Sequence, residues 1–106
     1  MKALTPLLRE HAAEAERQRK PVDKVMHAIE ATGAYRWFVP KRYGGHEFSL
    51  SGFMEVGVAL GEACVSHAWV TTFCMEHNWL LSLYDAPAQE DIFGSHPYII
   101  APGAMM

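Results

Sequence analysis

The sequence predicts an all-α fold, a bundle of about five helices. Three observations support this prediction. Segment 67–84 contains neither proline nor glycine, and most of its side chains are apolar. Apolar residues recur at helical spacing in two further segments, 22–29 and 53–63. Only one short segment, 98–101, has the composition of a strand.

Composition limits the class of protein. At 106 residues the chain is long enough for one domain with a modest core. Half of the residues are apolar, which argues against disorder, and a net charge of −3 without a long basic run argues against a nucleic-acid partner. No uninterrupted apolar run reaches the roughly 18 residues of a membrane span. Cys64 and Cys74 lack metal-binding spacing and indicate reduced thiols, so we expect a cytoplasmic protein.

The first two predicted helices lie before Gly33. We expect the first to run from Thr5 or Pro6 to about Arg19, because threonine can cap a helix and proline suits its first turn. The second should start at Pro21 and end at Gly33, which we expect to adopt a left-handed conformation. Its apolar face consists of Val22, Val25, Met26 and Ile29.

A connector follows, with an extended part and a turn. Pro40 keeps Val39 out of the helical region, so residues 35–40 should be extended. Tyr43-Gly44-Gly45 then predicts a turn, since paired glycines permit a positive φ and a close approach of two backbone segments.

The third predicted helix is capped by Ser49 or Ser51 and runs to about residue 63. Gly57 and Gly61 lie four residues apart on one side of it, which favours a close helix–helix contact. The alternative is that a well-packed bundle simply tolerates both glycines.

The fourth helix should be capped by Ser66 and end near Tyr84, and a short helix from Asp85 to Gly94 should follow. Segment 98–101 lies between prolines and has no partner strand in this chain. We therefore expect a helical domain over residues 1–97, and over residues 98–106 the start of a truncated β-domain. The chain is then a fragment of a larger protein.

One sector of the fourth helix is the candidate site. At about 100° per residue, Val70, Phe73, His77 and Tyr84 share a sector, with Trp69 at its edge. This wall suits a planar aromatic ligand that brings one polar group to His77. The alternative for His77 is a core histidine bonded to a backbone carbonyl.

The neighbouring sector of the same helix is small and polar, and it could line a second contact or a wet seam. Its residues are His67, Thr71, Cys74, Asn78 and Ser82. Because the helix is apolar on nearly every side, we expect it to be buried all round. No two histidines have the i, i+4 spacing of a helical metal clip, so we predict no metal site.

Three sequence features resemble the amino-terminal helical domain of the acyl-CoA dehydrogenase superfamily. They are a helix ending at Gly33, the Val39-Pro40 pair and the Tyr43-Gly44-Gly45 turn. Further residues look like one branch, the oxygenase component of two-component (group D) flavin-dependent monooxygenases. These are Ala68-Trp69-Val70, His77-Asn78-Trp79 and the run from Ala88 to Gly94.

The resemblance implies a subunit with this domain, a β-sandwich and a four-helix bundle, assembled as a homo-oligomer. A separate flavin reductase would supply reduced FMN or FAD, which binds between the two later domains. The whole enzyme would hydroxylate a small aromatic or polyketide-like substrate. This chain alone should bind no flavin and show no activity.

The resemblance also assigns roles on the fourth helix. His77 would be catalytic, bonding the substrate hydroxyl and favouring its phenolate, and Trp69, Phe73, Tyr84 and Asn78 would bind substrate. Two alternatives remain at this stage. The chain could be the amino-terminal domain of an acyl-CoA dehydrogenase, or a non-catalytic helical module that self-associates.

Overall fold

A computed structural model describes residues 2–101, and within that range it contains α-helices and short 3₁₀ helices but no strand. This confirms the predicted all-α bundle. The α-helices are α1 (Thr5–Gln18), α2 (Asp23–Ala31), α3 (Leu50–Ala63), α4 (Val65–Ser82) and α5 (Ala86–Phe93). Among residues 2–101, no helix combines the length and the apolarity needed to cross a membrane.

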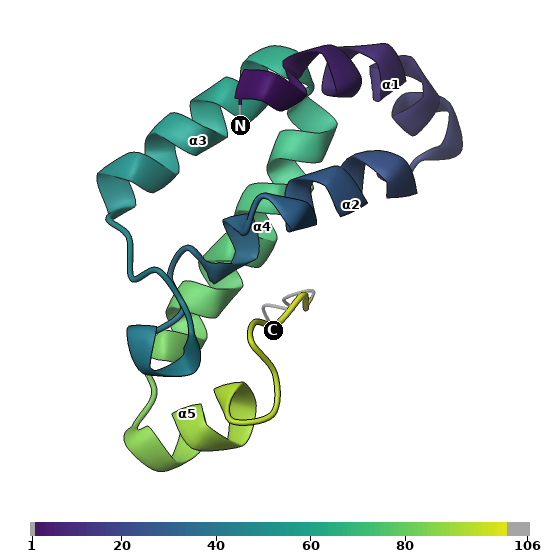
Figure 1. The fold of residues 1–106 in the computed structure, drawn as a ribbon. Helices are drawn as coiled ribbons and strands as arrows, with labels where there is room; N and C mark the ends of the chain where they lie inside the picture. Colours follow the sequence, from purple (N-terminus) through teal and green to yellow (C-terminus); the bar gives the residue numbers. More distant parts are fainter. Residues whose placement is uncertain (1, 102–106) are drawn as a thin grey trace.

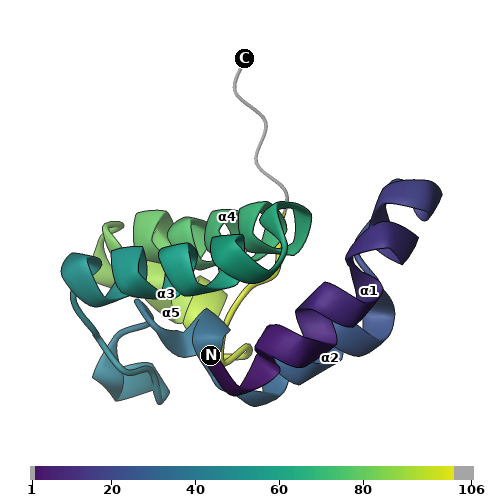
Figure 2. The same cartoon turned by 90° about the horizontal axis from the view of Figure 1, so that it is seen from above.

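The helix α4 is the element on which the others pack. It packs most extensively against α3 and also meets α1, α2 and α5 (Figure 1). Seen from above, α1 and α2 form a pair on one side of α3 and α4 (Figure 2). Beyond α5 the chain turns back, so that residues 99–101 lie beside the C-terminal half of α4.

The ends of α1 and α2 differ slightly from the prediction. Thr5 is the first residue of α1, but it does not cap the helix, because the 3₁₀ helix Lys2–Leu4 leads directly into it. The end of α1 is stabilised by the Gln18 amide, which donates to the carbonyls of Lys20 and Pro21, both at 3.1 Å. The helix α2 starts two residues after Pro21, at Asp23.

The glycine turn forms as expected, but the extended conformation predicted for residues 35–40 is wrong over their first part. Ala34–Arg36 form a 3₁₀ helix, and Trp37 also has helical backbone angles. Gly33 and Gly44 adopt positive φ angles of 83° and 82°. Residues 36–37 run beside residues 46–48, with the Phe48 N–H donating to the Trp37 carbonyl at 2.8 Å. The Tyr43 hydroxyl donates to the Glu90 carboxylate at 2.9 Å, so the turn is attached to α5.

The two glycines of α3 behave differently from each other. A Cβ atom on Gly57 would meet the methyl group of Thr72 at 3.4 Å, an ordinary contact, whereas one on Gly61 would meet nothing within 4 Å. The predicted close helix contact is therefore wrong at Gly61, which the bundle merely tolerates. Ser49 caps α3 as predicted, since its hydroxyl accepts the N–H of Gly52 at 3.2 Å.

The strand predicted over residues 98–101 is not formed. A strand needs a neighbour to pair its backbone groups, and residues 2–101 contain no other strand. The backbone groups of Ile99 bond instead to the Asn78 side chain on α4. Residues 102–106, the remainder of the predicted β-domain, lie outside the described part of the chain.

Candidate functional site

The small, polar sector of α4 faces the core. His67, Thr71 and Asn78 are fully buried, and Cys74 is 8 % exposed. The sequence suggested a second contact or a wet seam for this sector, and it expected α4 to be buried on every side. The wet seam and the burial of α4 on every side are both wrong, whereas this sector does contact other segments, at Val22 and Ile99. The polar side is the packed one because short side chains let neighbouring segments approach α4 closely, and because His67 and Asn78 find hydrogen-bond partners there.

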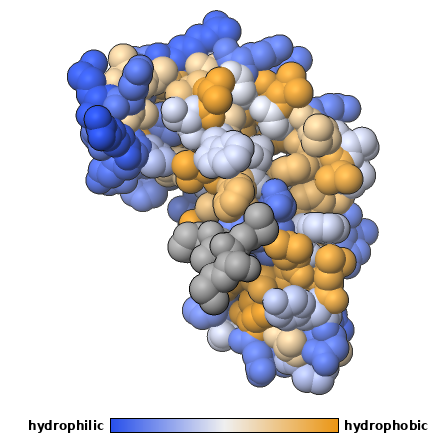
Figure 3. All heavy atoms as spheres, turned by 180° about the vertical axis from the view of Figure 1, so that it is seen from behind, coloured by the Kyte–Doolittle hydropathy of each residue, from blue (hydrophilic) through white to orange (hydrophobic). Residues whose placement is uncertain are grey.

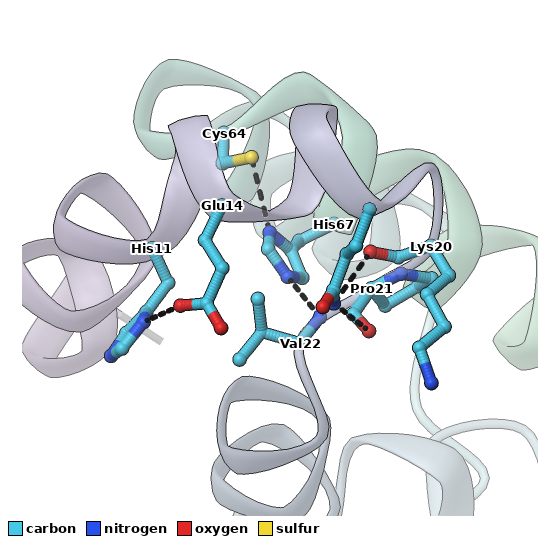
Figure 4. A network of polar contacts seen from close by, with 8 residues as sticks. His11, Glu14, Lys20, Pro21, Val22, Cys64 and His67 are labelled. Atoms are coloured by element: carbon cyan, nitrogen blue, oxygen red, sulfur yellow. Dashed lines mark hydrogen bonds and ion pairs between the residues drawn. The ribbon is translucent and has the colours of Figure 1, made fainter.

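His67 links three segments of the chain (Figure 4). Its Nε2 accepts the backbone N–H of Val22 at 3.1 Å, and its Nδ1 lies 3.1 Å from Sγ of Cys64. Since Nε2 is an acceptor, the neutral ring carries its hydrogen on Nδ1, which points at the sulfur. The base nitrogen of His67 is thus already engaged, so the Cys64–His67 pair is not arranged as a nucleophile with its general base.

Burial, and next the nearby His11, lowers the pKa of His67 below its usual 6.5. We predict that the free energy of unfolding falls as the pH drops below 6.5. Below pH 6.5, His67 binds a proton in the unfolded chain but not yet in the folded chain. Acid therefore favours unfolding until the pH reaches the lower pKa of His67 in the folded chain. Urea unfolding at pH 7.5 and pH 5.5 measures the decrease. His67→Gln, which cannot titrate, should show a smaller decrease, and an identical decrease in both proteins would contradict the prediction.

The other buried polar groups near α4 do not form a reactive centre. Burial raises the pKa of Tyr35 to about 12 and also raises the pKa of the Cys74 thiol. Both groups are therefore neutral near pH 7. The hydroxyls of Tyr35 and Thr71 are buried without a hydrogen-bond partner among residues 2–101.

The neighbouring, more exposed side of α4 carries three rings in contact, which we call the aromatic row: Trp69, Phe73 and His77. The centroids of Trp69 and Phe73 are 5.5 Å apart with nearly parallel planes, and Phe73 meets His77 edge to face at 4.7 Å. Exposure decreases along the row, from 67 % at Trp69 to 36 % at Phe73, and His77 is half-buried. The sequence prediction thus placed these three residues together correctly.

The remaining predicted site residues lie elsewhere. Tyr84 is 55 % exposed but follows the end of α4 at Ser82, so helical spacing no longer aligns it with His77. Val70 packs against the core. Asn78 is fully buried, and its amide bonds to the backbone of Cys74 and Ile99. His77 donates from Nδ1 to the carbonyl of Ala101, as in the alternative considered for it.

Apolar side chains also gather on α3 next to the aromatic row. Met54 and Val58 are 60 % and 59 % exposed, and with Trp69 they border a groove of about 420 Å³ between α3 and α4. Figure 3 shows several apolar residues on this side of the molecule. Exposed apolar area of this kind is typical of a surface that contacts a ligand or another part of a protein.

The aromatic row suits a phenol better than a flavin nucleotide. Its two apolar rings can contact a planar ring, and its imidazole offers one polar atom. A flavin nucleotide also brings phosphate groups, which need cations or free backbone N–H groups. The row has neither, so its residues do not fit the flavin phosphates.

The comparisons first give the class of protein: this helical domain is similar to the amino-terminal domain of proteins with an acyl-CoA dehydrogenase-like fold. The relatives then identify the branch. The chain is 38 % identical over 93 residues to the oxygenase subunit HsaA, a flavin-dependent monooxygenase from Rhodococcus jostii (strain RHA1), covering 88 % of this chain and 24 % of that one. It is 30 % identical to the oxygenase component of p-hydroxyphenylacetate 3-hydroxylase from Acinetobacter baumannii, over 89 % of this chain and 22 % of that one.

The structural comparison agrees with the sequence comparison. The crystal structure of the HsaA monooxygenase from M. tuberculosis superimposes with a TM-score of 0.84 at 32 % identity, over 90 % of this chain and 26 % of that one. The predicted resemblance to oxygenase components of two-component flavin-dependent monooxygenases is therefore confirmed. No family model matches the chain. The chain spans about a quarter of the length of the curated relatives it matches.

Two features of α4 were not predicted from the sequence. One is the bond between His67 and Val22, which are 45 residues apart, and the other is the pairing of Asn78 with Ile99. Nothing in the spacing of these residues indicates the contacts, because they depend on how α1 and α5 return the chain to α4. Only the tertiary structure shows that the polar sector of α4 is buried.

Proposed function

We propose that this chain forms one wall of the substrate pocket in a reduced-flavin-dependent hydroxylase of aromatic compounds. The observation that carries the proposal is the aromatic row, which stacks Trp69 and Phe73 beside His77 on the exposed side of α4. The names of the R. jostii and A. baumannii relatives, a flavin-dependent monooxygenase and a p-hydroxyphenylacetate 3-hydroxylase, support it. They favour a monooxygenase over an acyl-CoA dehydrogenase, the first alternative.

In this proposal each member of the row has its own role. Trp69 and Phe73 contact the substrate ring, and His77 bonds the substrate hydroxyl and takes its proton, which makes the ring a better nucleophile. Tyr84 lies at the edge of the pocket. Asn78 supports the pocket from behind, since it is buried and bonded to the backbone.

The relatives support a reduced flavin as cofactor and a separate reductase component as partner of the whole enzyme. Reduced FMN or FAD, delivered by a reductase component, supplies the oxygen chemistry in the whole enzyme, and this chain contributes substrate contacts to it.

We also propose a cytoplasmic homo-oligomer. The free thiols of Cys64 and Cys74 suit a reducing compartment. The exposed apolar side chains of α3 and α4 suit a face that other protein covers, and a self-associating module without catalytic activity would use the same face.

A chimera tests the proposal. Residues 5–101 replace the matching segment of the A. baumannii oxygenase component, and 3-hydroxylation of p-hydroxyphenylacetate is measured with reduced flavin and oxygen. We expect the chimera to be active and His77→Ala to lower kcat by about 100-fold or more, the usual contribution of a general base. Trp69→Ala should chiefly raise KM.

The matched control is His27→Ala, which removes an exposed histidine of α2 far from the aromatic row and should leave the rates unchanged. A His77→Ala chimera with the kcat of the parent chimera would refute the role of His77. An active chimera in which none of the three row residues affects kcat or KM would refute the pocket wall itself.

A further inference from the structure

Two adjacent side chains of α4 hold the same short segment of the chain. Oδ1 of Asn78 accepts the N–H of Ile99 at 2.9 Å, and Nδ2 donates to the Ile99 carbonyl at 2.8 Å. The Asn78 side chain therefore pairs both backbone groups of Ile99, as a residue of a partner strand would.

The orientation of the Asn78 amide is fixed by its surroundings. Nδ2 also donates to the Cys74 carbonyl at 3.1 Å, and the side chain is fully buried. A flipped amide would bring its oxygen against two carbonyl oxygens, which is unfavourable. Asn78 consequently holds Ile99 in one position relative to α4.

Ala101, two residues after Ile99, is held against His77. Its carbonyl oxygen faces Nδ1 of His77. A carbonyl has no hydrogen to donate, so Nδ1 must carry the hydrogen of this bond, and the neutral ring then has its lone pair on Nε2. His77 is half-buried, and no hydrogen bond among residues 2–101 involves its Nε2.

We propose that Asn78 is a positioning residue, which through Ile99 and Ala101 fixes His77 as the tautomer that presents an unprotonated Nε2. The consequence for catalysis rests on the proposed function. A substrate hydroxyl donates to Nε2, its O–H bond breaks and an N–H bond forms at Nε2. The products are a phenolate and an imidazolium whose Nδ1–H stays on the Ala101 carbonyl. The other neutral tautomer would only donate to the phenol oxygen and could not accept its proton.

The tautomer is measured directly by nuclear magnetic resonance on this chain with ¹⁵N-labelled histidine at pH 8, and His77→Gln assigns the signals. We expect a protonated Nδ1 and an unprotonated Nε2 at His77. In Asn78→Ala the two nitrogens should move toward the averaged shifts of an imidazole that exchanges between tautomers. A protonated Nε2 in the unmodified chain, or unchanged shifts in a folded Asn78→Ala, would overturn the proposal.

A second variant tests the proposal if Asn78→Ala does not fold, which circular dichroism would show as a loss of helical signal. Ile99→Pro removes the N–H that Asn78 accepts but leaves the buried side chains of α4 intact, and it should shift the His77 nitrogens in the same way. The control is Ile100→Ala, at a half-exposed residue between the two held ones, which should not change them. Because no ligand or flavin is present, the result is independent of whether the chimera hydroxylates a phenol.

Discussion

Replacing Gly45 with alanine is expected to destabilise the chain by about 3 kcal/mol. A Cβ atom at residue 45 would lie 1.9 Å from the carbonyl oxygen of Val39 and 2.5 Å from its Cβ. Val39 cannot yield easily, because it is fully buried and its carbonyl accepts the N–H of Glu47 at 3.2 Å. Gly45 is held as well, since its own N–H donates to the Pro40 carbonyl at 3.1 Å. Urea unfolding followed by circular dichroism measures the loss.

Gly61→Ala is the matched control, the same chemical change at a residue with free space. A Cβ atom there would meet nothing within 4 Å, and the residue lies inside α3. Alanine is favoured over glycine in a helix, so this variant should gain about 0.5–1 kcal/mol. A shift of the urea midpoint in the same direction for both variants would contradict the prediction. It would mean that the close approach to Val39 is not the reason for glycine at residue 45.

These two glycines illustrate which parts of the fold were predictable. Local chemistry is visible in the sequence, so the caps at Ser49 and Asp85 and the left-handed Gly33 were predicted correctly. The caps predicted at Thr5 and Ser66 are wrong, because both residues already lie inside a helix. Contacts between distant segments are not visible in the sequence. The Tyr-Gly-Gly turn predicted a close approach correctly, because Gly45 meets Val39, which lies only six residues earlier in the chain. The spacing of Gly57 and Gly61 predicted a helix contact that depends on where α4 lies, and at Gly61 that contact is missing.

The candidate site shows the same division. Helical spacing placed Phe73 and His77 in one sector with Trp69 at its edge, and the structure brings the three rings into contact. Spacing alone could not show that this sector faces outward, because its higher hydropathy favours its burial over burial of the neighbouring polar sector. The outcome is decided by hydrogen bonds from Val22 and Ile99, which make the polar sector of α4 the better one to bury.

His67→Ala is expected to lower the free energy of unfolding by about 3 kcal/mol at pH 7.5. The substitution removes a fully buried side chain and leaves the Val22 N–H, next to the start of α2, without its acceptor. His27→Ala, which removes an exposed histidine of α2, should change the free energy by less than about 0.5 kcal/mol.

The pH dependence of this loss separates the hydrogen bond from simple loss of packing. Nε2 of His67 can accept the Val22 N–H only while the ring is neutral, and its lowered pKa means that the native chain resists the proton that the unfolded chain takes up. Acid therefore weakens the parent chain through His67 but cannot weaken His67→Ala in this way. The difference between the two proteins should be smaller at pH 5.5 than at pH 7.5. An equal difference at both values would mean that His67 stabilises the core by its volume alone.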